Sequence, residues 1–214
     1  MLESPIFRLL AMSSALLLSI DPAAASDAID LEALVRGFAA MPGLSARFRE
    51  EKHISLLQVP LVSEGVLYFA PPDRIARHVE RPAPSTLLVR DDELVMGTAG
   101  ERHTLDLAAQ PVLRSFVDAF RLVLAGDIAR LRELYAIEFR ANDSQRDWQI
   151  QLLPRDEQLA GMIRSIQVAG RDAILLELRV VEADGDSTVT RFTDVDRNRR
   201  FSEPELDALF RIPP

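Results

Sequence analysis

The feature that most constrains this chain is an alternation of apolar and polar residues in its C-terminal half. The alternation occurs in three separate segments, at 135–140, 148–152 and 174–180. In each segment apolar side chains occupy every second position, and mostly polar side chains stand between them. Successive side chains of a strand point to opposite faces of the sheet, so this pattern predicts antiparallel strands with one apolar face and one solvated face.

The middle of the chain predicts further strands of the same kind. Strand-forming residues are concentrated in short segments that are separated by proline, aspartate and glycine, at 44–59, 62–69, 74–80, 85–90, 93–98 and 101–107. Asp184-Gly185 predicts a tight hairpin between strands 174–182 and 187–194. One last short piece is expected at 206–212. Strands at this spacing favour an antiparallel sheet or barrel over alternating strand–helix–strand units.

Three segments have the spacing of helices. The first is capped by Asp27 or Asp30 and ends at Pro42-Gly43. The second begins at Pro111, a residue that suits a first helical position, and ends at Gly126; Asp127 can cap the third. We therefore expect a mainly antiparallel β fold with α-helices, in which a large sheet curls around its apolar face and helices cover the opening.

The N-terminal segment predicts export. A short region with Arg8 precedes an apolar run from Leu9 to Ile20, and the small residues Ala23-Ala24-Ala25 follow Pro22. This is the arrangement of a secretory signal peptide, and the run is shorter than the roughly 20 residues that a membrane-spanning helix needs. We expect a signal peptide at 1–25, a single domain at 26–214 and a periplasmic location.

The composition excludes several classes of function. The 214 residues include no cysteine, so neither a disulfide nor a thiol for lipid attachment is expected. The net charge is −8 and no run of basic residues is present, which argues against a nucleic-acid partner because phosphate binding depends on clustered Lys and Arg. A monomer without a cofactor is expected.

No sequence motif predicts catalysis. His53, His78 and His103 are isolated in the sequence, and neither a zinc-protease, a nucleophile-elbow nor a phosphate-loop motif is present. The stretch from Asp194 to Glu205 places oxygen ligands at five positions of a calcium loop, but Arg199 stands where the sharp turn needs glycine. We therefore expect no enzyme and favour a structural turn over a metal site.

Several motifs, in order, resemble the family of the lipoprotein carrier LolA. They are an early strand with phenylalanine followed by polar residues, a glycine-containing strand followed by a proline turn, a hairpin and a closing strand, at Phe48–Glu51, Gly65–Arg74, Leu87–Leu94 and Phe210–Pro214. Gly126-Asp127, Trp148–Pro154 and Glu182–Asp186 are similar to a divergent branch of that family. The match extends over nearly all of the predicted mature chain.

The resemblance implies a half-open β-barrel that is closed by helices, with a cavity for acyl chains. It implies a carrier that receives lipoproteins from an inner-membrane transporter and passes them to an outer-membrane acceptor. Two departures suggest a different lid or cargo: Pro71 stands where the carriers have an arginine, and Arg77 stands where they have an aromatic residue.

Strand alternation and helical phase suggest which side chains line such a cavity. The apolar candidates are Leu67, Phe69, Ile75, Val79, Phe116, Phe120, Trp148, Ile150, Leu176 and Leu178. Arg77 is a further candidate: it either pairs with an anionic cargo head inside the cavity or faces solvent, the more usual place for arginine. The pattern alone leaves open whether the interior holds a ligand or is filled by side chains.

Two functions follow from these predictions. The first is a carrier or chaperone that binds the acyl chains of lipoproteins or other lipids. The alternative is a lipid-sensing or accessory subunit of an envelope export or regulatory complex, with a stable protein partner.

Overall fold

The computed structural model describes residues 29–98, 100–142 and 146–212, so the predicted signal peptide lies outside the described residues. Within them the chain forms one 11-stranded sheet in the order β6-β5-β4-β3-β2-β1-β11-β10-β9-β8-β7. The strands are β1 (Leu44–His53), β2 (Leu61–Ala70), β3 (Arg74–Arg81), β4 (Ser85–Arg90), β5 (Glu93–Thr98), β6 (Glu101–Asp106), β7 (Tyr135–Asn142), β8 (Asp147–Pro154), β9 (Ile163–Arg171), β10 (Ile174–Glu182) and β11 (Ser187–Asp196).

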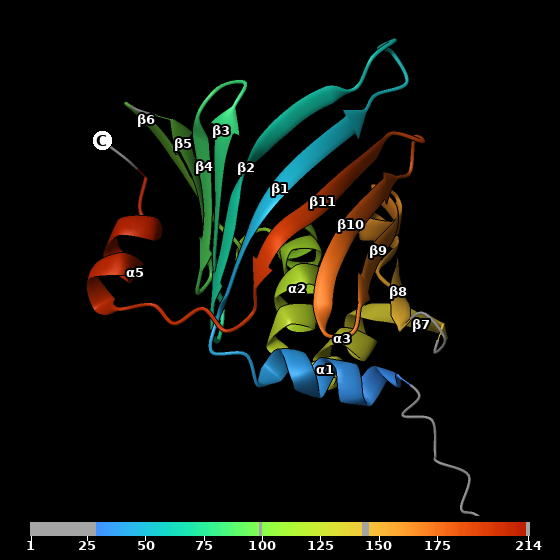
Figure 1. Cartoon of the computed structure of the whole chain (residues 1–214). Coiled ribbons are helices and arrows are strands. Elements are labelled where there is room, and N and C mark those ends of the chain that lie inside the picture. Colours follow the sequence, from blue (N-terminus) through green and yellow to red (C-terminus); the bar gives the residue numbers. More distant parts are fainter. Residues whose placement is uncertain (1–28, 99, 143–145, 213–214) are drawn as a thin grey trace, which may run out of the picture.

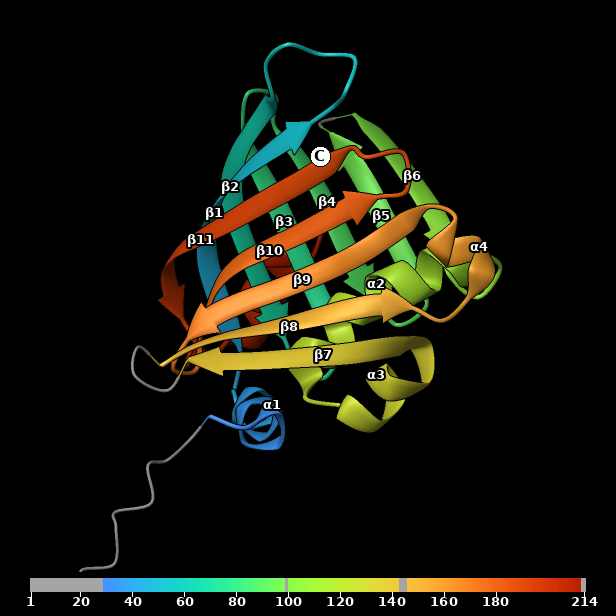
Figure 2. The same cartoon turned by 90° about the vertical axis from the view of Figure 1, so that its right-hand side faces the viewer.

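Every neighbouring pair of strands in this sheet is antiparallel, as the alternation predicts. The two end strands, β6 and β7, do not pair with each other, so the sheet curls without closing. Figure 1 and Figure 2 show the strands wrapped around α2 (Pro111–Ala125). The prediction of a half-open, mainly antiparallel barrel with helices is confirmed.

The helices begin and end largely where the sequence predicts. The side chain of Asp30 caps α1 (Leu31–Ala39), and Asp127 Oδ1 accepts a hydrogen bond of 3.0 Å from the Arg130 amide to cap α3 (Ile128–Leu134). Gly126 ends α2 with a φ of +71°, a conformation that favours glycine. The short α4 (Glu157–Ala160) and α5 (Glu203–Leu209) were not predicted as helices.

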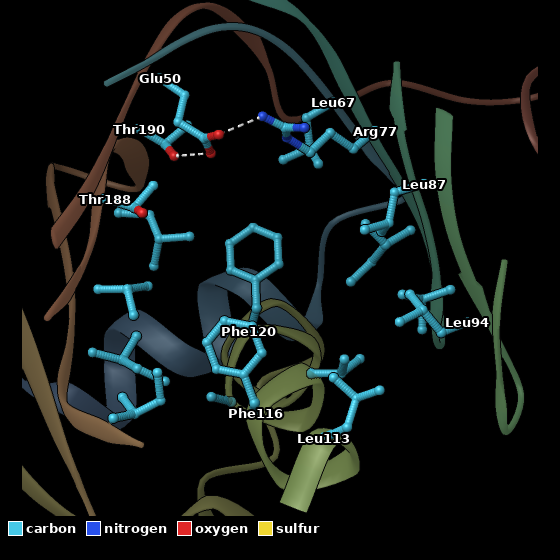
Figure 3. Close-up of a pocket in the computed structure, with 18 of the residues that line it drawn as sticks. Glu50, Leu67, Arg77, Leu87, Leu94, Leu113, Phe116, Phe120, Thr188 and Thr190 are labelled. Atoms are coloured by element: carbon cyan, nitrogen blue, oxygen red, sulfur yellow. Dashed lines mark hydrogen bonds and ion pairs between the residues drawn. The ribbon is translucent and has the colours of Figure 1, made fainter. Parts of the chain in front are cut away.

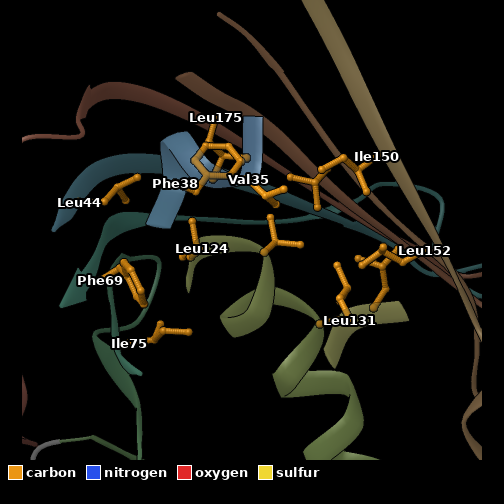
Figure 4. Packing of buried hydrophobic residues seen from close by; sticks show 14 of the residues in the cluster. Val35, Phe38, Leu44, Phe69, Ile75, Leu124, Leu131, Ile150, Leu152 and Leu175 are labelled. Atoms are coloured by element: carbon orange, nitrogen blue, oxygen red, sulfur yellow. The ribbon is translucent and has the colours of Figure 1, made fainter. Parts of the chain in front are cut away.

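The main core lies on the concave face of the sheet, at the end where α1, α2 and α3 gather (Figure 1). Figure 4 shows α1 and α2 packing their apolar side chains against β8 and β10. The ring of Phe38 in α1 contacts the ring of Trp148 edge-to-face, with 5.7 Å between centroids. This packing fills the interior of the sheet at that end: Leu131, Ile150 and Leu152 have no exposed surface.

A second, smaller core lies on the convex face of the sheet. Here α5 and the residues around it cover β2 to β5, with Phe201, Leu206 and Phe210 packed against Ala76, Leu88 and Val95. The resemblance implied a closing strand at Phe210–Pro214, and this prediction is wrong for its described part, because Phe210 follows a helix that lies across the outside of the sheet. A strand added at the edge would have left the convex apolar side chains exposed.

The predicted strand 44–59 is also shorter than expected. β1 ends at His53, and the following loop projects beyond the rim of the barrel (Figure 1). Leu56 and Val59 in this loop are largely exposed to solvent. In the sequence these apolar residues resemble part of a strand, but in the structure neither side chain packs against a face of the sheet.

Candidate functional site

A cavity of about 740 Å³ lies between α2 and the concave face of the sheet. Its walls come from strands on both sides of α2, from Leu159 of α4 and from Met162, which lies between α4 and β9. The lining comprises Phe48, Glu50, Lys52, Leu67, Ile75, Arg77, Leu87, Val89, Leu94, Met96, Gln110, Val112, Leu113, Phe116, Val117, Ala119, Phe120, Leu159, Met162, Ile163, Ile166, Leu178, Val180, Glu182, Thr188, Thr190 and Phe192. Most of these side chains are apolar, so the cavity suits an apolar ligand.

Two aromatic side chains of α2 project into this space. Figure 3 shows Phe116 and Phe120, one helical turn apart, pointing up between the two walls of the sheet. Ala119, Val123 and Leu124 lie on the same apolar face of the helix, at i+3 or i+4 spacing from these rings, and are buried in the main core. One apolar face of α2 therefore holds the helix in the core toward its C-terminal end and lines the cavity with Phe116 and Phe120.

The polarity of the lining changes along the strands. On β1, the inward-facing Phe48 near the helices is followed by Glu50 and then Lys52 toward the β1–β2 loop. On β11, the inward-facing Phe192 near the helices is preceded by Thr190 and Thr188. The cavity thus has an apolar end beside α2 and a polar end toward the loop.

Four side chains at the polar end form a hydrogen-bonded group, which we name the Glu50 cluster: Glu50, Ser63, Arg77 and Thr190. Arg77 Nη2 donates to Glu50 Oε1 at 2.8 Å and to Ser63 Oγ at 3.2 Å. Thr190 Oγ1 donates to the other carboxylate oxygen, Oε2, at 2.9 Å (Figure 3). The Arg77 guanidinium carbon lies 4.3 Å from the centre of the Phe48 ring, within the range of a cation–π contact.

A second ion pair lies nearer the rim of the cavity. Lys52 Nζ is 3.3 Å from Glu182 Oε1 across the β1 and β10 walls. All four side chains of these two ion pairs line the cavity, so the described lining carries no net charge. A charged ligand head would leave one charge without a partner, whereas an uncharged head would not.

Six of the sequence-predicted residues line the cavity: Leu67, Ile75, Arg77, Phe116, Phe120 and Leu178. Arg77 therefore faces the cavity, where its ion-pair partner is Glu50. Phe69, Trp148 and Ile150 point to the concave face as predicted, but they are buried in the filled part of the core. Val79 packs at the margin of that core, outside the cavity lining.

The placement of Leu176 in the cavity wall is wrong. Its side chain is 39% exposed, and the buried neighbour Leu175 points inward instead. The register between β10 and β9 shifts between Leu175 and Glu177, which is the position of an extra residue in β10. A bulge of this kind changes which side chains face inward, so Leu175 and Leu178 share one face although their spacing is odd.

Sequence reasoning missed much of the wall formed by β1, β4, β5 and β11. The missed residues include Phe48, Glu50, Leu87, Leu94, Thr190 and Phe192. A usable signal was present for β1, since Phe48, Glu50 and Lys52 alternate in an expected strand. The pairing of Glu50 with Arg77 has no signal in the sequence, because it joins residues on β1 and β3 that are not neighbours along the chain.

The charged side of α2 connects the helix to two turns of the sheet. Arg114 Nη2 lies 2.8 Å from Asp92 Oδ1, and Arg121 Nη1 donates to the Asp91 carbonyl oxygen at 3.0 Å. Asp118 lies between these arginines, and burial raises the pKa of its carboxyl more than the nearby Arg121 and Arg114 lower it. Burial also raises the pKa of Tyr135, whose hydroxyl donates to the Ser115 carbonyl oxygen at 2.7 Å.

Two of the residues considered for metal binding and catalysis, Glu205 and His78, make hydrogen bonds within the fold. Glu205 accepts hydrogen bonds from the amide and hydroxyl of Ser202 and forms a capping box for α5. Among the residues that the structure describes, no group of three or more potential metal ligands is found. His78 lies on the convex face, where its Nε2 is 2.7 Å from the Leu209 carbonyl oxygen.

No helix in the described part of the chain has both the length and the apolar character required to span a bilayer.

The fold resembles several solved structures at low sequence identity. A LolA superfamily protein from Nitrosomonas europaea aligns with a TM-score of 0.44 at 12% identity, over 86% of this chain and 98% of that chain. A DUF1329 family protein from Desulfovibrio piger aligns with a TM-score of 0.48 at 11% identity, over 84% of this chain and 96% of that chain.

The complex of MucA and MucB from Pseudomonas aeruginosa contains a further similar chain. It aligns with a TM-score of 0.47 at 12% identity, over 81% of this chain and 57% of that chain. A search of curated protein sequences finds no match. The sequence pattern of the family described as "Outer membrane lipoprotein carrier protein LolA-like" matches residues 23–198. Since this match covers most of the sequence, the chain belongs to that LolA-like family.

Proposed function

We propose that this protein is a periplasmic carrier that binds the acyl chains of lipoproteins or other lipids and moves them toward the outer membrane. The observation that carries the proposal is the cavity of about 740 Å³ with predominantly apolar walls. This volume lies within the roughly 300–1,000 Å³ that is typical of small-molecule sites.

An acyl chain is the ligand that such a wall favours. Each methylene group transferred from water to an apolar surface contributes about 0.8 kcal/mol, so a long chain supplies most of its affinity through contact area alone. The same wall offers few directional contacts at the apolar end of the cavity, which suits cargo of variable chain length. Phe116 and Phe120 are only partly buried, so they can change rotamer as a chain enters or leaves.

The location and the partners are part of this proposal. The predicted signal peptide supports a periplasmic location, and membership of a family named for lipoprotein carriers supports handover between an inner-membrane transporter and an outer-membrane acceptor. The protein acts by binding and release, without chemical change to its cargo.

A pair of variants on β10 tests the proposal. Leu178→Glu places a carboxylate in the cavity wall, and the matched control Leu176→Glu places the same group on the exposed face two residues away. Affinity for an acyl-chain fluorescent probe should fall at least about tenfold in Leu178→Glu, because a buried charge without a partner is costly. It should change less than about twofold in Leu176→Glu, where the charge stays in water.

Circular dichroism checks that both variants retain the fold. The carrier proposal is wrong if the wild-type protein fails to bind the probe, or if the two variants bind it equally. Tight lipid binding without exchange between vesicles, together with a stable protein partner, would instead support the sensor or accessory function.

A further inference from the structure

The Glu50 cluster stands out because charged side chains are costly on the concave face of an otherwise apolar sheet. Its four members come from β1, β2, β3 and β11, which are adjacent in the sheet. The side chains of Glu50 and Arg77 are each about a quarter exposed, and both line the cavity.

The cluster retains hydrogen-bonding capacity toward the cavity. A guanidinium has five N–H donors, and only those on Nη2 of Arg77 have acceptors among the described residues. Nε and Nη1 are therefore available to a ligand. Glu50 Oε2 accepts one bond from Thr190 and, as a carboxylate oxygen, can accept another.

The charges of the cluster decide which ligand head it accepts. Glu50 neutralises Arg77 at 2.8 Å, and Glu182 neutralises Lys52 at 3.3 Å. An anionic head that approaches Arg77 also approaches Glu50, which repels it. An uncharged head that contains ester, amide or hydroxyl groups accepts from Nε and Nη1 of Arg77 and donates to Glu50, and it leaves both ion pairs intact.

We propose that the Glu50 cluster is the head-group site of the cavity and that it selects acylated ligands with an uncharged polar head over fatty-acid anions. This inference rests on the proposed acyl-chain function and adds the class of ligand head. It departs from the anionic partner that Arg77 alone suggested, because Glu50 already neutralises the guanidinium.

Competition between two ligands with the same acyl chain tests this inference. Monooleoylglycerol and oleate displace an acyl-chain fluorescent probe at pH 8 from the wild type, from Glu50→Gln and from Glu51→Gln. Glu51→Gln is the matched control, because it removes the same charge from a neighbouring residue whose partners, Arg49 and Arg191, lie outside the cavity lining.

The wild type should bind monooleoylglycerol at least about fivefold more tightly than oleate, a modest ratio because the cluster is partly solvated. Glu50→Gln should tighten oleate binding by about fivefold and change monooleoylglycerol binding by less than about twofold, since the amide removes the repulsion but preserves the shape. Glu51→Gln should leave the wild-type ratio unchanged.

Two results overturn the head-group inference alone: the wild type binds oleate as tightly as monooleoylglycerol, or Glu50→Gln shifts the affinities for both ligands equally. Failure of both ligands to displace the probe from the wild type would overturn the acyl-chain function as well. The outcomes therefore distinguish failure of the head-group inference from failure of the proposed acyl-chain function.

Discussion

The two halves of the sheet are covered on opposite faces. In the filled half, β7 to β10, helices α1 to α4 cover the concave face, and the convex face carries polar side chains such as Gln149 and Gln151. In the open half, β2 to β5, α5 covers the convex face. On the concave face of the open half, Phe69 packs into the main core, whereas Leu87 faces Phe116 and Phe120 of α2 across the cavity (Figure 3).

This difference shows how an open sheet can be stable and still retain space for a ligand. The filled half packs most of its apolar side chains against the helices and fixes the position of α2, and the start of β9 and the end of β10 line the cavity. The open half obtains part of its stability from the outside, through α5, and so does not need a filled interior. The apolar surface that remains uncovered is therefore concentrated where a ligand can reach it.

The largest expected effect tests whether the filled half carries more of the stability. Leu152→Ala removes a side chain with no exposed surface, and it should lower the free energy of unfolding by about 3 kcal/mol because a void is left in the core. Leu87→Ala, the matched change in the cavity wall, should cost about 1 kcal/mol because that side chain already borders open space. Urea denaturation of lipid-free protein measures both, and equal losses would contradict the comparison.

A somewhat smaller effect separates stability from binding in the open half. Phe210→Ala removes the aromatic ring that packs α5 onto the convex face, and it should lower the free energy of unfolding by about 2 kcal/mol. Probe affinity should remain within about twofold of the wild-type value, because Phe210 does not line the cavity. A large loss of affinity in the folded variant would mean that the outer layer shapes the cavity.

The smallest effect concerns the way α2 meets the two halves. Its contact with the filled half is apolar, whereas Arg114 and Arg121 bind turns of the open half with Asp118 between them. Burial raises the pKa of Asp118, so the folded protein binds the proton of this carboxyl more tightly than the unfolded chain does. The contribution of Asp118 to the free energy of unfolding should therefore decrease as pH rises from the ordinary value of 3.8 through the raised pKa.

Asp118→Asn cannot lose this proton and should remove that part of the pH dependence. The variant should match the wild type below pH 3.8 and be slightly more stable at pH 7, as thermal unfolding across this pH range can measure. If the variant is less stable than the wild type at pH 7, the stabilisation from the ion pairs of Asp118 exceeds the cost of burying its carboxylate.

The sequence predicted which side chains of β8 face inward. The alternation at 148–152 identifies Trp148, Ile150 and Leu152 as inward-facing, and all three are. What it could not predict is that helices would bury these side chains, since that depends on how α1 and α2 pack in three dimensions. The resulting error was to assign Trp148 and Ile150 to the cavity.

Three other features had a weaker local signal. The extra residue in β10 of the filled half, which turns Leu176 outward, leaves no mark in the apolar run that ends at Leu176. The position of α5 depends on an apolar convex face that the sequence alone did not reveal. The Glu50 cluster depends on the register of four strands, and register follows from the whole sheet.

The central claim is that the sheet leaves, beside α2, a cavity that holds an acyl chain. The most direct test is mass spectrometry of an organic extract of the protein, purified from the periplasm without detergent, with Leu178→Glu and Leu176→Glu processed in parallel. The claim predicts an acylated lipid in near-stoichiometric amount with the wild type and Leu176→Glu, and little lipid with Leu178→Glu. Wild-type protein that is folded and free of lipid, and that takes up none when it is incubated with lipid vesicles, would contradict the claim.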